Sequence, residues 1–357
     1  MYMKILVLVL AQAFLLKVNE AKFINDEYNK DEMPTELGEI EEDNKNDRTK
    51  AADIKRAIGE PKKESFGEAS IELARLHLLE EASRKRKALE NLKNEVNENS
   101  EDNCRKIKKV GEPIVHQHSG STYGAWMRDP LGLLGPEKIW YINGYYGNKV
   151  LEFESMDHFK AGEVAKTYIL PYHIDGTGSV VYGRYLYFNR ANTKSIVQYD
   201  LVKEIVTREK TPSGNVSPRK YYYSWGGYTT MDLSVDESGL WVLYGHSSYS
   251  GKLCATQLDP LTLGAIHTYC PVSTKAMRSM GNAFVACGIV YSIDSYSAVT
   301  TTINYAYDTS TRTATTPGIS FLNKFTYNSM VTYNPREKVL YSWNKNRQIT
   351  YPLEFED

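Results

Sequence analysis

The residues of this chain best suited to chemistry are its four cysteines, Cys104, Cys254, Cys270 and Cys287. None stands in a C-x-x-C spacing, so a zinc site is not expected. In an oxidising compartment, four cysteines predict two disulfides, for which three pairings are available. Cys254 and Cys270 flank the turn Asp259-Pro260. Antiparallel strands leaving that turn would bring the two sulfur atoms opposite each other, so a local bridge is expected.

Acidic and histidine residues are the next candidates for catalysis. Asp236 and Glu237 lie in VDESG, which is typical of a β-turn, and adjacent turn carboxylates rarely converge in a pocket as general acid–base chemistry requires. His116 and His118 would share one face of a strand, but no third metal ligand stands near them, so a surface pair is expected. The sequence contains no G-x-S-x-G, P-loop or H-E-x-x-H motif. We therefore assign no catalytic residue and expect a protein that is not an enzyme.

The first residues have the features of a secretory signal. A short basic start precedes about a dozen apolar residues, which are too few to span a bilayer comfortably, and a small residue follows at Ala21. Residues 1–21 are predicted to be a signal peptide, and no later run reaches spanning length. The formal net charge of −1 offers no field for nucleic acid. The sequon at Asn215 is a candidate glycosylation site, as expected for a secreted glycoprotein.

Composition divides the remaining chain into three parts. Residues 22–65 are charged and poor in aromatic side chains, so they are predicted to be a disordered leader. Residues 66–100 are rich in helix formers, and a heptad reading makes six of eight seam positions apolar. This pattern permits a short coiled coil that would join copies of the chain through residues 66–98, or a solvated single helix. From residue 104 to 357 the composition becomes typical of β-structure.

A repeat runs through this β-rich part. Five strand-like runs combine an aliphatic and an aromatic residue at intervals of 47, 54, 50 and 50 residues: KIWYI at Trp140, RYLYF at Tyr187, GLWVL at Trp241, GIVYS at Tyr291 and VLYSW at Tyr341. Units of this length, each with about four strands, match the blades of a propeller. A β-sandwich needs only about 100 residues for seven strands. The sequence therefore predicts an all-β fold, a five-bladed β-propeller.

Five longer motifs resemble those of the olfactomedin-domain family: YGAWMRDP (123–130), YSWGGYT (223–229), DLSVDESGLWVLY (232–244), GNAFVACGIVY (281–291) and YNSMVTYNPREKVLYSWN (327–344). The family fold is a five-bladed propeller, in agreement with the repeat. In that family a cysteine before the first strand is bonded to the one in the NAF-x-x-CG motif. The resemblance thus implies a Cys104–Cys287 disulfide.

The resemblance also implies a calcium ion in the central channel, where strands of several blades supply oxygen ligands. Carried onto this sequence, the family ligands are Asp232, Asn282, the carbonyl of Ala283 and the carbonyl of Val331.

The family's second aspartate is Thr332 here, and losing a carboxylate lowers the charge that tunes calcium affinity. Three outcomes stay open: weakly bound calcium, sodium in its place, or a site closed by hydrogen bonds of Thr332. Asp294 could supply the missing charge if its strand faces the axis.

These observations predict a secreted protein of the extracellular space or matrix that recognises or adheres to other extracellular or cell-surface proteins through an olfactomedin-like propeller. An N-terminal helix would make it a homo-oligomer, and linked propellers would bind with avidity. The alternatives are a secreted five-bladed-propeller glycoside hydrolase, which would need two or three carboxylates converging at the axis, and a purely structural matrix component.

Overall fold

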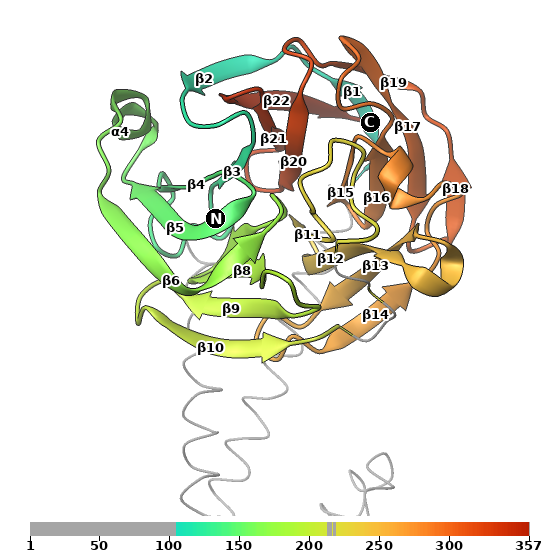
Figure 1. Cartoon of the computed structure of the whole chain (residues 1–357). Coiled ribbons are helices and arrows are strands. Elements are labelled where there is room, and N and C mark those ends of the chain that lie inside the picture. The colour runs from blue at the N-terminus through green and yellow to red at the C-terminus, as the bar shows by residue number, and fades with distance from the viewer. Residues whose placement is uncertain (1–104, 213–215, 217–218, 357) are drawn as a thin grey trace, which may run out of the picture. The chain divides into compact units, whose positions relative to one another are not determined.

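The computed structural model describes residues 105–212, 216 and 219–356. The signal peptide (1–21), the leader (22–65) and the helical segment (66–100) that the sequence predicts lie outside the described residues, as do Cys104 and Asn215. The described part is almost entirely β-structure, arranged as five sheets around a central axis (Figure 1). The predicted five-bladed propeller is confirmed.

Each sheet is antiparallel, and in the first four blades consecutive strands run outward from the axis. The first blade consists of β3 (Gly124–Met127), β4 (Ile139–Asn143), β5 (Tyr146–Phe153) and β6 (Lys166–Asp175). The second consists of β7 (Val180–Tyr182), β8 (Tyr185–Asn189), β9 (Ile196–Asp200) and β10 (Ile205–Lys210). The third consists of β11 (Met231–Asp236), β12 (Gly239–His246), β13 (Lys252–Leu258) and β14 (Ala265–Tyr269).

The fourth blade consists of β15 (Asn282–Ala286), β16 (Ile289–Ile293), β17 (Thr300–Asp308) and β18 (Thr313–Thr315), and β19 (Ile319–Leu322) also pairs with β17. The fifth contains β20 (Asn328–Asn334), β21 (Val339–Asn344) and β22 (Arg347–Phe355). Three short helices interrupt the described strands: α4 (Met156–Ala161), η1 (Ser247–Tyr249) and η2 (Met277–Ser279).

Both ends of the described chain meet in the fifth blade. Strands β1 (Ile107–Val110) and β2 (Ile114–His118) pair with β22, so the earliest strands complete a sheet that the last strands begin (Figure 1). Because every other blade is built from one continuous segment, this pairing is what closes the ring.

The aromatic residues of the sequence repeat occupy equivalent places in the five blades. Each lies on the second strand of its blade, and each is at most 2% exposed: Trp140 on β4, Tyr187 on β8, Trp241 on β12, Tyr291 on β16 and Tyr341 on β21. The repeat therefore records the side chains that fill the space between neighbouring sheets, where burial of large aromatic surfaces stabilises the ring.

Carboxylates of one blade bind backbone N–H groups in the turn of the next. Asp236 Oδ2 accepts from Gly288 N at 2.7 Å, and Glu237 Oε2 accepts from Cys287 N at 3.0 Å. Asp129 in the same way accepts from Gly183 N at 2.8 Å. The acidic pair of VDESG thus has a structural role between the third and fourth blades.

Within the third blade, Cys254 and Cys270 form a disulfide with their Cα atoms 4.5 Å apart. Ala255 pairs with Tyr269 in the β13–β14 ladder, which places the two cysteines opposite each other, as the turn between them predicts. Cys287 is also disulfide-bonded. Its predicted partner, Cys104, is outside the described residues, so that pairing stays a prediction. No helix in the described ranges is both long and apolar enough to cross a membrane.

Candidate functional site

The predicted ion ligands lie on the first strands of three blades. Asp232 is on β11, Asn282 and Ala283 are on β15, and Val331 and Thr332 are on β20. These strands contact one another around the axis, and all five residues are buried. Residues separated by up to 100 positions in the sequence are therefore brought to neighbouring inner strands.

Asp232 is a buried carboxylate, and among the described residues one side chain hydrogen-bonds to it. Its Oδ2 accepts a hydrogen bond of 2.8 Å from the hydroxyl of Tyr223, which is itself buried. Burial raises the pKa of Asp232 to about 8, and the Tyr223 hydrogen bond only partly opposes this rise. Among the described residues, no Lys or Arg contributes to the shift. A carboxylate in this position is either protonated or balanced by a cation that the polypeptide does not supply.

Thr332 stands where the resemblance implies a second carboxylate. Its Oγ1 is buried and has no hydrogen-bond partner within the described part of the chain. The hydrogen bonds that would close the site in one of the three predicted outcomes are therefore not formed by the described residues. The hydroxyl oxygen is available as a neutral ligand.

The remaining side-chain ligand, Asn282, is already oriented. Its Oδ1 accepts from the backbone N–H of Ala283 at 2.9 Å, and a carbonyl-type oxygen retains a second lone pair.

One carboxylate, one amide oxygen, one hydroxyl and backbone carbonyls are thus present on neighbouring inner strands, and these are the oxygen donors that hard cations prefer. The described residues contain no group of three or more His, Cys, Asp or Glu that could hold a metal. By their chemistry these residue types suit a hard cation, and one of them, Asp232, carries a negative charge to balance it.

Asp294 does not join this donor set among its described contacts. It follows β16, where its Oδ1 accepts from Asn304 Nδ2 at 2.7 Å and lies 3.6 Å from Lys275 Nζ. These partners are on β17 and on the loop before β15, so the aspartate does not replace the missing charge.

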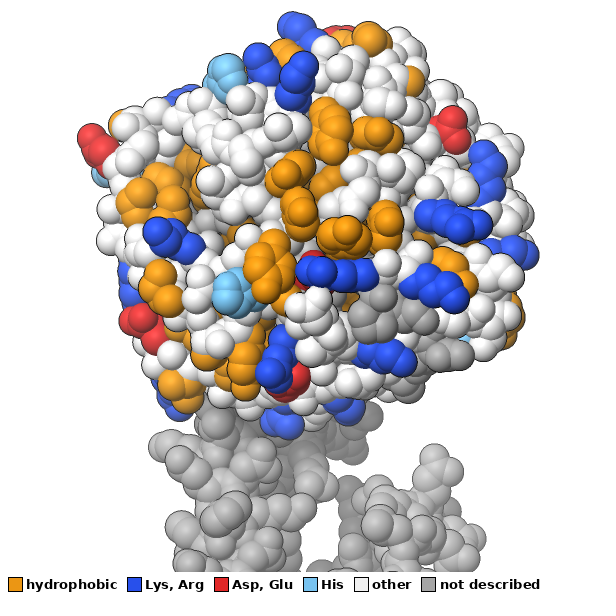
Figure 2. Space-filling model, in the orientation of Figure 1, with side chains coloured by type: hydrophobic (Ala, Val, Ile, Leu, Met, Phe, Trp, Pro, Cys, Tyr) orange, Lys and Arg blue, Asp and Glu red, His pale blue; other side chains and the backbone are white. Residues whose placement is uncertain are grey.

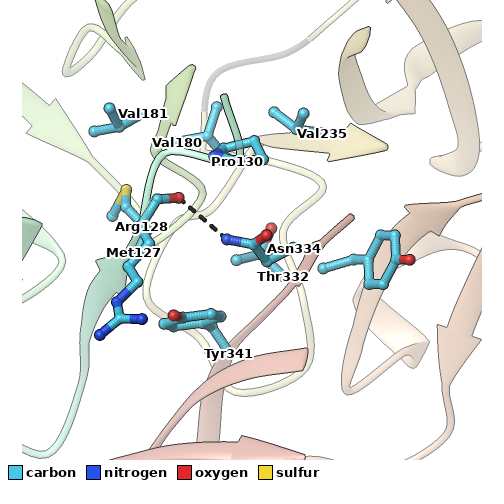
Figure 3. Close-up of a pocket in the computed structure, with 10 residues that line it drawn as sticks. Met127, Arg128, Pro130, Val180, Val181, Val235, Thr332, Asn334 and Tyr341 are labelled. Atoms are coloured by element: carbon cyan, nitrogen blue, oxygen red, sulfur yellow. Dashed lines mark hydrogen bonds between the residues drawn. The ribbon is translucent and has the colours of Figure 1, made fainter. Parts of the chain in front are cut away.

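One cavity at the axis is small. The inner strands of four blades line it with Val180, Val235, Thr332 and Asn334 among others, and its volume is about 10 Å³ (Figure 3). Asn334 Nδ2 donates to the backbone oxygen of Arg128 across one side of it at 3.5 Å. That volume holds roughly one water molecule. A polysaccharide chain does not fit there.

A second feature lies on the face seen in Figure 1. Figure 2 shows hydrophobic side chains gathered at the middle of this face, with Lys and Arg around them and few acidic side chains. Eight aromatic residues from the loops and strand ends of four blades are linked by ring contacts, by one hydrogen bond and by Arg219, and we call them the aromatic face: Tyr123, Tyr145, Tyr146, Tyr222, Trp225, Tyr228, Tyr296 and Tyr327.

Ring contacts join the aromatic face across blades. The ring centroids of Tyr123 and Tyr145 are 4.8 Å apart, and each ring is within 6.4 Å of Trp225. The Tyr327 hydroxyl donates to the backbone oxygen of Trp225 at 3.2 Å, and its ring packs against Tyr296. Segments of four blades thus build one connected cluster, in which Trp225 is buried and the tyrosines around it are partly exposed.

Arg219 lies against two further tyrosines of the aromatic face, Tyr228 and Tyr146. Its guanidinium lies 4.7 Å from the ring centroid of Tyr228 and 5.8 Å from that of Tyr146. It also pairs with Asp175, which is buried beneath it, through a contact of 3.0 Å. Tyr146 is 48% exposed. The surface is therefore aromatic and cationic, and the carboxylate beneath Arg219 is already neutralised.

The aromatic face was not predicted as a site from the sequence, although its residues lie in recognisable motifs. Tyr123, Trp225 and Tyr327 all fall in or beside the motifs that carry the family resemblance. Tyr123 and Tyr327 come directly before the first strands of their blades, β3 and β20, and Trp225 lies six residues before β11. That position relative to the predicted inner strands is the signal that could have found them.

Comparison with known proteins gives a consistent result. The family model for the olfactomedin-like domain matches residues 99–357. Myocilin of Rattus norvegicus is 38% identical over 261 residues, which cover 71% of this chain and 52% of that protein. Myocilin of Homo sapiens is 36% identical over 258 residues, covering 70% and 51%. The chain thus spans about half the length of the curated relatives it matches.

Among solved structures, the glutaminyl cyclase of Myxococcus xanthus matches with a TM-score of 0.44 and 12% identity, over 71% of this chain and 99% of that chain. A likeness at this level supports no conclusion about function.

Proposed function

Because the chain belongs to the olfactomedin-like domain family, we propose that it is a secreted protein of the extracellular matrix that recognises other extracellular or cell-surface proteins, and that the aromatic face makes the contact. The observation that carries this proposal is the joining of aromatic residues from four blades in one cluster, with Arg219 against it.

The composition of this face matches that of protein-binding surfaces. Tyr, Trp and Arg are enriched in interfaces and supply most binding hot spots. A rigid ring with few rotatable bonds loses little entropy when a partner covers it. Arg219 adds a positive charge to this face, and the carboxylate beneath it is already paired, so the partner that the face fits best presents an acidic surface with apolar groups between its carboxylates.

The sequence similarity to myocilin supports the extracellular assignment. The predicted signal peptide and the disulfides support it independently, because disulfides persist in an oxidising compartment. Extracellular recognition also agrees with a propeller whose loops are held by tight inter-blade contacts. The activity of the whole myocilin chain is not transferred, because this chain matches only about half of it.

Self-association is the second part of the proposal. Residues 66–98 would form a coiled coil that links propellers, and two weak contacts on one oligomer would bind far more tightly than either alone. Deleting residues 66–98 is expected to lower the molar mass measured by light scattering to that of one chain. An unchanged molar mass would contradict the coiled coil.

An ion at the axis is the third part. The donor set around Asp232 and Thr332 would hold weakly bound calcium or, alternatively, sodium, and the bound cation would supply the positive charge that this buried carboxylate lacks. Its role is structural, because it would hold the inner strands of three blades together.

The geometry favours a protein that is not an enzyme over a glycoside hydrolase. A hydrolase needs two carboxylates about 5–9 Å apart beside a bound sugar. Of the described acids near the inner strands, Asp129 and Asp236 are engaged by backbone N–H groups of turns, and the axial cavity described above is only about 10 Å³.

A cell-binding experiment tests the recognition proposal. Fluorescently labelled full-length protein is added to cultured cells before and after mild protease treatment, and bound fluorescence is measured by flow cytometry. We expect binding that protease treatment removes, that falls as salt rises, and that Tyr146→Ser with Tyr228→Ser lowers at least tenfold. Ile266→Ser is the matched control, since Ile266 is an exposed apolar residue of the outer strand β14.

Equal binding by the aromatic-face variant and the control would contradict the proposed surface. Self-assembly of the protein without any cell binding would instead favour the purely structural matrix component.

A further inference from the structure

A cavity between the third and fourth blades, lined mainly by residues with polar side chains, is distinct from both features described above. Its volume is about 180 Å³, and it lies between the loop that precedes β15 and the strands β16 and β17. Nine of its ten lining side chains carry a polar group, and the tenth is Met280. Ligand pockets for drug-sized molecules are about 300–1,000 Å³, so this one suits a smaller, hydroxyl-rich or amide-rich ligand.

Three side chains in the cavity form an ordered hydrogen-bond chain. The hydroxyl of Ser292, which is 3% exposed, donates to Asn304 Oδ1 at 3.3 Å. Asn304 Nδ2 in turn donates to Asp294 Oδ1 at 2.7 Å. These contacts set the orientation of the amide, because its oxygen and its nitrogen each have a defined partner.

The chain leaves complementary groups for a ligand. Asp294 Oδ2 has no hydrogen-bond partner among the described residues, so it can accept, and the second N–H of Asn304 Nδ2 and the ammonium of Lys275 can donate. Lys275 Nζ lies 3.6 Å from Asp294 Oδ1. A sugar hydroxyl both donates and accepts. Two adjacent hydroxyls therefore match an acceptor and a donor held side by side.

The charges in the cavity point to a neutral ligand. Lys275 and Asp294 have opposite charges, and the other lining side chains are uncharged, so the lining has no net charge to attract a phosphate or an ammonium group. Tyr305 and Met280 add apolar surface, which the C–H groups of a pyranose ring can cover.

We propose that this cavity, held by Asp294, Asn304 and Lys275, binds one neutral pyranose residue of a glycan. The site is independent of the aromatic face. It gives the propeller a second kind of ligand, a carbohydrate, beside the protein surface it is proposed to recognise.

In the test, the full-length protein is titrated with single sugars, and binding is measured by saturation-transfer difference NMR. The probes are methyl β-D-galactopyranoside, methyl α-D-mannopyranoside, methyl N-acetyl-β-D-glucosaminide and, as a charged comparison, the methyl glycoside of N-acetylneuraminic acid. A ligand of about a dozen heavy atoms in such a site should bind with a dissociation constant of about 1 mM. We expect at least one neutral sugar to bind in this range.

Substitutions locate the binding. Asp294→Asn and Asn304→Ala are expected to weaken it at least tenfold, and Glu354→Gln, a surface carboxylate on β22, should leave it unchanged. Asp294 is half exposed, with a side-chain exposure of 49%, so its replacement should not unfold the protein; the melting temperature of each variant checks this.

Three results would overturn the proposal: no binding by any neutral sugar at ten times that concentration, binding that Asp294→Asn does not change, or binding by the charged sugar alone. None of them bears on the cell-binding experiment with the aromatic-face variants, so the two proposals can fail separately.

Discussion

The hydroxyl of Tyr223 donates a 2.8 Å hydrogen bond to Oδ2 of Asp232, and both side chains are buried. The carboxylate has no cationic side chain among the described groups that shift its pKa. One phenol therefore provides the protein's own stabilisation of this charge, and without an ion from solution the carboxyl group, with its pKa of about 8, is mostly protonated at neutral pH.

Replacing Tyr223 with Phe tests that relationship. The variant leaves a buried carboxylate without its donor, so we expect the free energy of unfolding to fall by about 1–3 kcal/mol. Urea denaturation at pH 9, above the pKa of about 8 of Asp232, measures it. Tyr199→Phe is the control, since no described residue hydrogen-bonds the Tyr199 hydroxyl. Equal losses in the two variants would show that the Tyr223–Asp232 bond adds nothing beyond the ring.

Restoring the second carboxylate should strengthen the ion site. In Thr332→Asp, two axial carboxylates would repel each other without metal and attract a divalent ion when it is present. We expect millimolar calcium to raise the melting temperature of the variant by about 5–10 °C and that of the natural chain by less than about 5 °C. In chelator, the variant should melt below the natural chain.

Thr332→Asn provides the uncharged control, because it adds an amide of the same shape. A calcium response in the natural chain as large as in Thr332→Asp would mean that a single carboxylate suffices.

The blades were predictable from the sequence, and the aromatic face was not. The blades of Trp140 and Tyr341 can be recognised in the sequence, because burial between sheets requires a large apolar side chain at the same place in every repeat. Tyr123 and Tyr327 are not part of this regular spacing. They lie in loops, and loops come together only when the ring closes, here through pairing of β1 and β2 with β22.

The axial site was predictable in part for a similar reason. The missing carboxylate at Thr332 could be read directly from its motif. The direction of the Asp294 side chain could not be read from the motif, because Asp294 lies just after the end of β16. Its position depends on the pairing of β16 with β17, in which Ser292 lies opposite Tyr305. Strand alternation alone does not specify the conformation of a residue beyond the strand end.

His116 should make stability depend on pH. Its Nε2 lies 2.7 Å from Thr350 Oγ1, and burial, with a smaller effect of the Lys160 and Arg128 charges, lowers its pKa to about 4. The folded state therefore holds the ring neutral, while in the unfolded chain it titrates near 6.5. The resulting stability is complete above pH 6.5 and is lost as pH falls toward 4.

Urea denaturation at pH 7.5 and pH 5 measures this effect. Because the ring is partly exposed, we expect the His116 contribution to the loss at pH 5 to be roughly 1 kcal/mol. His116→Gln keeps a hydrogen-bonding group without a titratable one, so its loss between the two pH values should be smaller by that amount. Identical pH dependence in the two proteins would exclude His116 as the source.

The two disulfides should contribute unequally to stability. The Cys254–Cys270 bridge closes a loop with a sequence separation of 16, whereas a Cys104–Cys287 bridge would close more than 180 residues. In the chain-entropy model these loops contribute about 3 and about 5 kcal/mol. Urea denaturation should therefore show a larger loss for Cys104→Ser with Cys287→Ser than for Cys254→Ala with Cys270→Ala. Non-reducing peptide mapping of the natural chain provides the independent check, and a Cys287 peptide linked to any cysteine other than Cys104 would refute the pairing.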